Sequence, residues 1–168
     1  MATKKSDSNA AVEAESAARP SFGEVKAALD KALGKPKKSG GILRYTAPDD
    51  ANEVKDWVGR VHAAGGSASL AEAHPARVLA VVEGQPSALM DLVTWISWQS
   101  KSARKALDIL DKDAGLRVAN INYTNFVIQL DRAPRDPDAH AKRLAKIVLN
   151  GNASKIAAAL KTKRWKTG

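Results

Sequence analysis

The residues of this sequence that are best suited to binding chemistry are basic and lie near the C-terminus. They are Lys142, Arg143, Lys146, Lys155, Lys161, Lys163, Arg164 and Lys166, and Trp165 lies inside the last group. Lys and Arg side chains neutralise phosphates and release counterions, which supplies most of the non-specific affinity for nucleic acid. An aromatic ring among them can stack on an unpaired base. The pattern therefore predicts a largely sequence-tolerant nucleic-acid interface.

A second group of polar and aromatic residues lies in an extended segment before this basic region. Asn122 and Tyr123 are its central members, and Asn120, Asn125 and Phe126 lie beside them. Amide and ring groups on an exposed sheet face can contact or stack on bases. We therefore add Asn122 and Tyr123 to the predicted interface. The same residues also fit an ordinary strand whose polar side chains face water. The aromatic pair of an RNA-recognition motif is absent, because residues 78–82 are aliphatic.

The remaining polar residues show no pattern that is typical of catalysis. The histidines, His62, His74 and His140, have no metal-ligand residue three or four positions further on, and the sequence contains no cysteine. Asp108, Asp111 and Asp113, with Lys112 among them, are typical of a solvated helix end. Walker, dinucleotide-binding and Gly-x-Ser-x-Gly motifs are also missing. We therefore predict no enzymatic activity, no cofactor and no metal site.

The positive charge of the chain is concentrated at its ends. The net charge is +9: residues 1–41 carry +3, residues 42–132 carry −1 and residues 133–168 carry +7. This distribution attracts polyanions, although a solvated basic tail that aids solubility has the same composition. We expect three segments: 1–41, a disordered tail with a short tethered helix and a basic linker; 42–132, an α+β core domain; and 133–168, a basic helical extension.

The N-terminal segment contains one helix signal. Ser21 and Glu24 form a capping box, and an apolar face follows until Gly34. Residues 1–20 are polar and are expected to be disordered, and residues 35–41 are expected to form a flexible linker. The helix at 21–34 could dock on its own domain or on a protein partner.

The middle segment alternates strand and helix patterns. Strands are expected at 42–45, 67–73, 78–82 and 118–130, with a bulge or a turn at 124–125 in the last. Helices are expected between Asp50 and Gly65 and between Pro86 and Gly115. The order β-α-β-β-α-β is typical of a ferredoxin-like sandwich, with two helices on one face of a four-stranded antiparallel sheet. Two basic helices are expected after Pro137.

The predicted helix between Pro86 and Gly115 has an unusually wide apolar arc. Trp95 and Trp98 lie on neighbouring parts of its surface, while Ile96 points elsewhere. Such an arc predicts burial on more than one side, either under the C-terminal helices or against another subunit. Since large aromatic residues are enriched at interfaces, we predict a homo-oligomer.

The sequence lacks a long apolar run and an apolar region at its start, so we expect no membrane partner and a cytoplasmic or nucleoid-associated location. The leading hypothesis is binding of DNA or RNA, with single strands among the candidates. The alternative is an assembly or adaptor role, for example in a structural or regulatory protein of a virus, through the helix at 21–34. The polymer type, any sequence preference and the oligomer number stay open.

Overall fold

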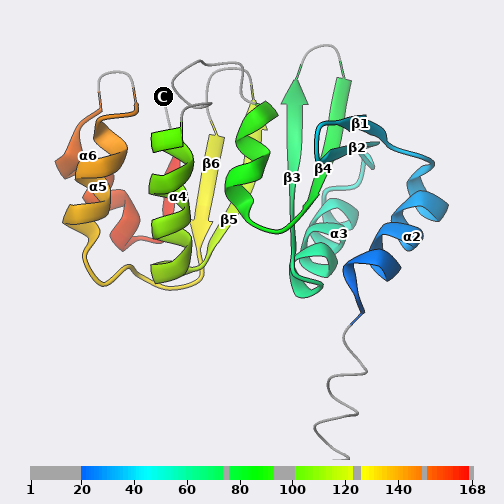
Figure 1. The fold of residues 1–168 in the computed structure, drawn as a ribbon, viewed down its shortest axis with the longest axis horizontal. Coiled ribbons are helices and arrows are strands. Elements are labelled where there is room, and N and C mark those ends of the chain that lie inside the picture. Colours follow the sequence, from blue (N-terminus) through cyan, green and yellow to red (C-terminus); the bar gives the residue numbers. More distant parts are fainter. Residues whose placement is uncertain (1–19, 74–75, 93–100, 123–125, 149–150, 167–168) are drawn as a thin grey trace, which may run out of the picture.

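The computed structural model describes residues 20–73, 76–92, 101–122, 126–148 and 151–166. These residues form a mixed α+β structure around one seven-stranded sheet. The strand order is β1-β2-β4-β3-β5-β6-β7 (Figure 1). Every pair of neighbouring strands is antiparallel except β3 and β5, which run parallel.

The elements follow one another with short connections. In the first half these are α2 (Phe22–Leu33), β1 (Lys37–Ser39), β2 (Ile42–Thr46), α3 (Ala51–Ala63), β3 (Gly66–Ala73) and β4 (Ala76–Glu83). In the second half these are the 3₁₀ helix η1 (Pro86–Leu92), α4 (Lys101–Ala114), β5 (Leu116–Asn122), β6 (Phe126–Leu130), α5 (Pro137–Ala145), α6 (Ala153–Lys161) and β7 (Arg164–Lys166).

Local signals in the sequence define the helix ends. The Ser21 hydroxyl accepts a hydrogen bond from the Glu24 backbone N–H at 3.2 Å, as the capping box predicts. Helix α2 ends before Gly34, which has φ 84°, and α4 ends before Gly115, which has φ 68°. Glycine adopts this left-handed conformation without a Cβ penalty. Both predicted helix stops are therefore confirmed.

The topology differs from the expected sandwich. Strands β2 and β3 are both antiparallel to β4, which lies between them, so β2, α3, β3 and β4 form a split βαβ unit. Strand β5 then pairs with β3 in parallel instead of completing a four-stranded antiparallel sheet. The expected extended segment 118–130 contains two strands, β5 and β6, with a register shift between Val118 and Asn120. A ferredoxin-like fold is thus not confirmed, although the mixed α+β class is.

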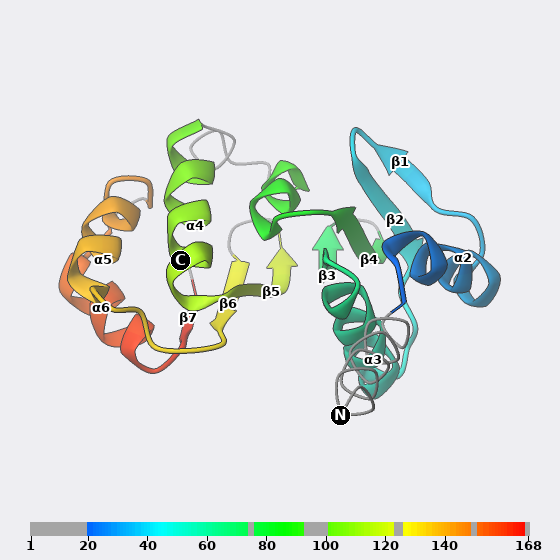
Figure 2. The same cartoon turned by 60° about the horizontal axis from the view of Figure 1, so that its bottom comes forward.

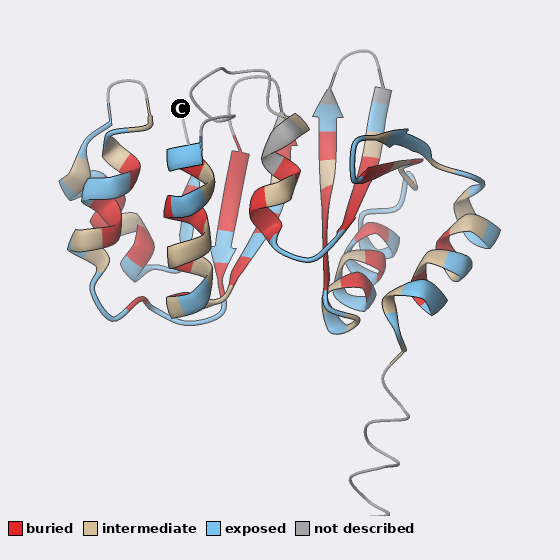
Figure 3. Ribbon diagram, in the orientation of Figure 1, coloured by how far each residue is buried: buried red, intermediate tan, exposed pale blue. Residues whose placement is uncertain are grey.

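Helices cover the two faces of the sheet at different places. Helices α2 and α3 pack on one face over β2, β4 and β3, in a cluster that includes Val25, Trp57 and Leu79. On the opposite face, η1, α4, α5 and α6 share a cluster with β5, β6 and β7. Figure 2 shows the two groups of helices on opposite sides of the sheet, and Figure 3 shows buried residues along their inner sides.

Two segments outside the expected core domain at 42–132 contribute strands to the sheet. Residues 37–39 form β1, which pairs with β2 across the turn Gly40-Gly41. They are therefore part of a hairpin and not of a flexible linker. Strand β7 pairs with β6, and α5 and α6 contribute Leu144 and Leu160 to the core. The basic C-terminal helices thus pack on the core.

Helix α2 docks on its own chain. Val25 is 1 % exposed and Leu29 is 0 % exposed in the cluster over β2 and β4. The Tyr45 hydroxyl donates a 2.6 Å hydrogen bond to the Asp30 carboxylate, which fixes the end of α2 to the sheet. The expected disordered residues 1–19 and the pair Trp95 and Trp98 lie outside the described residues.

Candidate nucleic-acid interface

Strand β7 places two of the predicted basic residues on a sheet face. Successive side chains of a strand point to opposite sides, and here Trp165 is buried while Arg164 and Lys166 are exposed. Trp165 belongs to the core cluster under α4, α5 and α6. Arg164 and Lys166 therefore lie on the other face, the one on which α2 and α3 pack over β2, β4 and β3.

Strand pairing brings residues from β5 and β6 beside these two cations. Arg117 pairs with Gln129, and Gln129 pairs with Arg164, so the three side chains form one row across the strands. Asn120, Val127 and Lys166 form the next row. Directly paired residues point to the same side, with Cβ atoms about 5 Å apart. We call these six residues the open face; Val127 is its one buried member, at 9 % exposed.

The open face is cationic. Arg164 and Lys166 make no ion pair within the part of the chain that the structure describes. Arg117 Nε lies 3.2 Å from Oδ1 of Asp131, but both side chains are about two-fifths exposed, at 43 % and 42 %. An ion pair this exposed contributes little, so Arg117 can exchange it for a phosphate. The open face thus carries three cations, and the carboxylate paired with one of them, Asp131, lies just after β6.

The other predicted basic residues lie on different surfaces. Lys142 and Arg143 are exposed on α5, Lys146 follows that helix, and Lys155 and Lys161 are exposed on α6. Lys163 is exposed in the turn before β7, with φ 64°. The basic C-terminal residues are therefore divided between the open face and the helical side of the molecule.

Trp165 does not fill the role that the sequence predicted. Its side chain is 6 % exposed and meets Phe126 edge-on, with ring centroids 6.0 Å apart. A ring held in the core cannot stack on a base, so the assignment of Trp165 to the interface is wrong. Phe126 is likewise buried. Asn122 lies at the end of β5, but its side chain, like the whole of Tyr123, is outside the described residues.

Arg117 and Gln129 were missed from the sequence. Each alternates with buried neighbours on its strand, Leu116 and Val118 around Arg117 and Ile128 and Leu130 around Gln129. This alternation was the available signal, because it assigns both polar side chains to the face away from the core. The residues that join them are distant in sequence, and no local pattern reveals the pairing.

The aspartates at the end of α4 are structural rather than merely solvated. Asp111 Oδ1 accepts the Leu116 backbone N–H at 2.8 Å. Asp113 Oδ2 accepts the Arg135 backbone N–H at 3.0 Å and lies 2.7 Å from Nε2 of His140. His140 is itself buried. The interpretation of this segment as a solvated helix end is therefore wrong for Asp111 and Asp113, which join α4 to the chain that follows it.

Comparisons with protein-family models, curated proteins and solved structures found no match to this chain. Among the described residues, no helix has the length and apolar character needed to cross a membrane. Nor do the described His, Asp and Glu residues form a cluster of three that could hold a metal ion.

Proposed function

We propose that the protein binds nucleic acid through the open face. The observation that supports this most directly is the arrangement of Arg117 on β5 and of Arg164 and Lys166 on β7, on the two sides of β6. All three side chains are exposed on the same face of the sheet. Neighbouring strands are about 4.8 Å apart, so Arg117 and Arg164 are separated by roughly 10 Å. Cations at this spacing can contact successive phosphates of one strand.

Binding of this kind is dominated by phosphate contacts. Gln129 lies between the two arginines and can donate to or accept from sugar and base edges. Among the described residues of the open face there is no aromatic side chain that could stack on bases. We therefore propose sequence-tolerant recognition, to which the basic residues of α5 and α6 add long-range attraction.

The alternative, an adaptor role through residues 21–34, receives less support. The apolar face of α2 is occupied by the sheet of its own chain through Val25 and Leu29. A protein partner would have to displace that contact or use the exposed side of the helix. The proposal of a homo-oligomer stands on Trp95 and Trp98 alone.

The test is fluorescence anisotropy with labelled single-stranded DNA, duplex DNA and RNA across a salt series. Arg164→Gln/Lys166→Gln removes two cations from the open face. If both contact phosphates, the slope of log K against log salt should fall in magnitude by roughly 1.4–1.8. Removal of the whole segment after Arg132 is a poor substitute, because it also deletes core residues such as Leu144 and Leu160.

The matched control is Lys31→Gln/Arg135→Gln, which removes one Lys and one Arg from exposed positions outside the open face, α5 and α6. Its salt slope should equal that of the unaltered protein. Equal losses in the two double variants would show that net charge, not the open face, determines binding. Absence of binding to all three polymers at low salt would reject the proposed function.

A further inference from the structure

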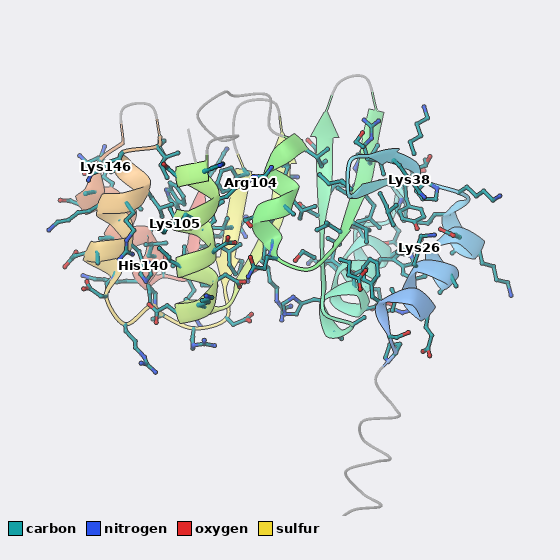
Figure 4. The ribbon with its side chains drawn as sticks, viewed as in Figure 1. Lys26, Lys38, Arg104, Lys105, His140 and Lys146 are labelled. Carbon is teal, nitrogen blue, oxygen red and sulfur yellow. The ribbon has the colours of Figure 1, made fainter. Side chains whose placement is uncertain are left out.

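A groove lies between α4 and α5, on the helical side of the molecule and away from the open face. Its volume is about 650 Å³, and it is lined by Ser102, Lys105, Ala106, Ile109, Arg143, Lys146 and Ile147. Figure 4 shows Lys105 on α4 and Lys146 at the end of α5 on the same side of the molecule as His140. The volume lies within the usual range for small-molecule sites.

The groove combines an aliphatic floor with a cationic rim. Ala106 is buried, and Ile109 and Ile147 are half-buried, so the floor is apolar. Lys105, Arg143 and Lys146 are exposed, and no carboxylate is among the described residues that line the groove. Contact between the floor and an apolar ligand is favourable because it removes apolar area from water. The cationic rim attracts an anion.

One of the rim cations is held in place by a buried network. Arg143 Nη1 lies 3.2 Å from Nδ1 of His140, which therefore accepts a hydrogen bond from the guanidinium. The His140 Nε2–H then donates to Asp113 at 2.7 Å. A guanidinium that is oriented before the ligand arrives loses less conformational freedom on binding. Two of its N–H groups can donate parallel hydrogen bonds to the two oxygens of a carboxylate.

These features define the class of ligand. We propose that the groove binds a free aliphatic carboxylate, that is, a fatty acid whose chain lies on Ile109 and Ile147 and whose head group meets Lys105, Arg143 and Lys146. The described lining contains no aromatic residue for a base or sugar to stack on. A nucleic-acid backbone would use the rim but leave the apolar floor uncovered.

The absence of cysteine from the chain allows a direct test. Ser102→Cys places a single thiol at an exposed position of the groove lining, and iodoacetamide alkylates it at a measurable rate. Laurate below its micellar concentration is expected to slow this alkylation severalfold in a saturable manner. Ser154→Cys, at an exposed position of α6, is the matched control and should be alkylated at an unchanged rate.

Three further measurements test whether both the carboxylate and the aliphatic chain of laurate are needed for protection. Dodecyltrimethylammonium has a similar chain with the opposite charge, and acetate has the head group without the chain, so neither should protect. Lys105→Gln/Lys146→Gln, in the Ser102→Cys background, should raise the half-protecting laurate concentration by roughly tenfold or more. A circular-dichroism melt of each variant verifies that it is folded.

Other outcomes would overturn the proposal. These are no protection by laurate, equal protection of both thiols, equal protection by the cationic amphiphile, or an undiminished effect in the double lysine variant. Protection by an oligonucleotide in place of laurate would assign the groove to nucleic acid instead. Because none of these variants alters the open face, failure here leaves the proposed function to its own test.

Discussion

His140 and Asp113 join the end of α4 to α5 through a 2.7 Å contact between Nε2 and Oδ2. The two side chains are 7 % and 18 % exposed, so little water is available to replace either partner. Asp113 also accepts the Arg135 backbone N–H, and His140 accepts from Arg143. This pair therefore supports both the helix packing and the orientation of a cation at the groove.

Asp113→Ala should destabilise the protein by about 1–3 kcal/mol, because it leaves the buried His140 Nε2–H without an acceptor. Urea denaturation at neutral pH measures this change. Asp56→Ala, at an exposed position of α3, is the control and should stay within about 0.5 kcal/mol of the unaltered protein. Equal effects of the two substitutions would contradict a structural role for the pair.

The same pair predicts a dependence of stability on pH. The hydrogen bond from His140, followed by the one from the Arg135 backbone, holds the pKa of Asp113 below its ordinary value of 3.8. A carboxyl group with a lowered folded-state pKa contributes stability above its unfolded-state pKa, and this contribution is lost as the pH falls through the folded-state pKa. The free-energy difference between the unaltered protein and Asp113→Asn should therefore be greatest above about pH 4. It should shrink on further acidification, and a constant difference would contradict the assignment.

Trp165 provides a prediction that separates stability from binding. Trp165→Ala removes a ring that is 6 % exposed and should cost about 3–5 kcal/mol of unfolding free energy. Trp165→Phe keeps a ring against Phe126 and should cost less. In the anisotropy assay, Trp165→Phe should bind like the unaltered protein, since the side chain does not reach the open face. A loss of affinity matching that of Arg164→Gln/Lys166→Gln would restore Trp165 to the interface.

Short-range features of the fold were predictable, and long-range pairing was not. The caps at Ser21 and Gly34 depend on residues three or four positions apart, so the sequence displays them directly. Strands β1 and β7 each have three residues and are rich in Lys and Arg. Three residues show too little alternation to be recognised, and their composition is typical of a solvated tail. Their place in the sheet is determined by neighbours that the local sequence does not identify.

The candidate site was also predictable only where it depends on local sequence and not on strand pairing. Arg164 and Lys166 were predicted because basic residues are visible in composition. Arg117 and Gln129 were not, because their relevance arises only when β5, β6 and β7 pair. Trp165 was misassigned for the complementary reason: the sequence shows an aromatic residue among cations, but only the pairing of β7 shows that alternate residues face opposite sides.

Tyr45 and Asp30 give the last prediction, which concerns the docking of α2. The hydrogen bond from Tyr45 and then the one from Lys26 hold the pKa of Asp30 below its ordinary value. Tyr45→Phe removes the 2.6 Å bond and should cost about 1.5 kcal/mol, at the low end for a bond to a charged group because Asp30 is 30 % exposed. Amide hydrogen exchange should accelerate in α2 before it does in β4.

Lys26→Gln is the matched control for this prediction. It removes the other partner of Asp30, an i,i+4 ion pair at 3.0 Å whose lysine side chain is 37 % exposed, and should cost no more than about 0.5 kcal/mol. The contrast arises because the Tyr45 hydroxyl comes from the sheet, whereas Lys26 belongs to the same helix as Asp30. Of the two bonds to Asp30, only the one from Tyr45 connects α2 to the sheet, so equal exchange in the two variants would show that apolar contacts such as those of Val25 and Leu29 hold the helix in place without it.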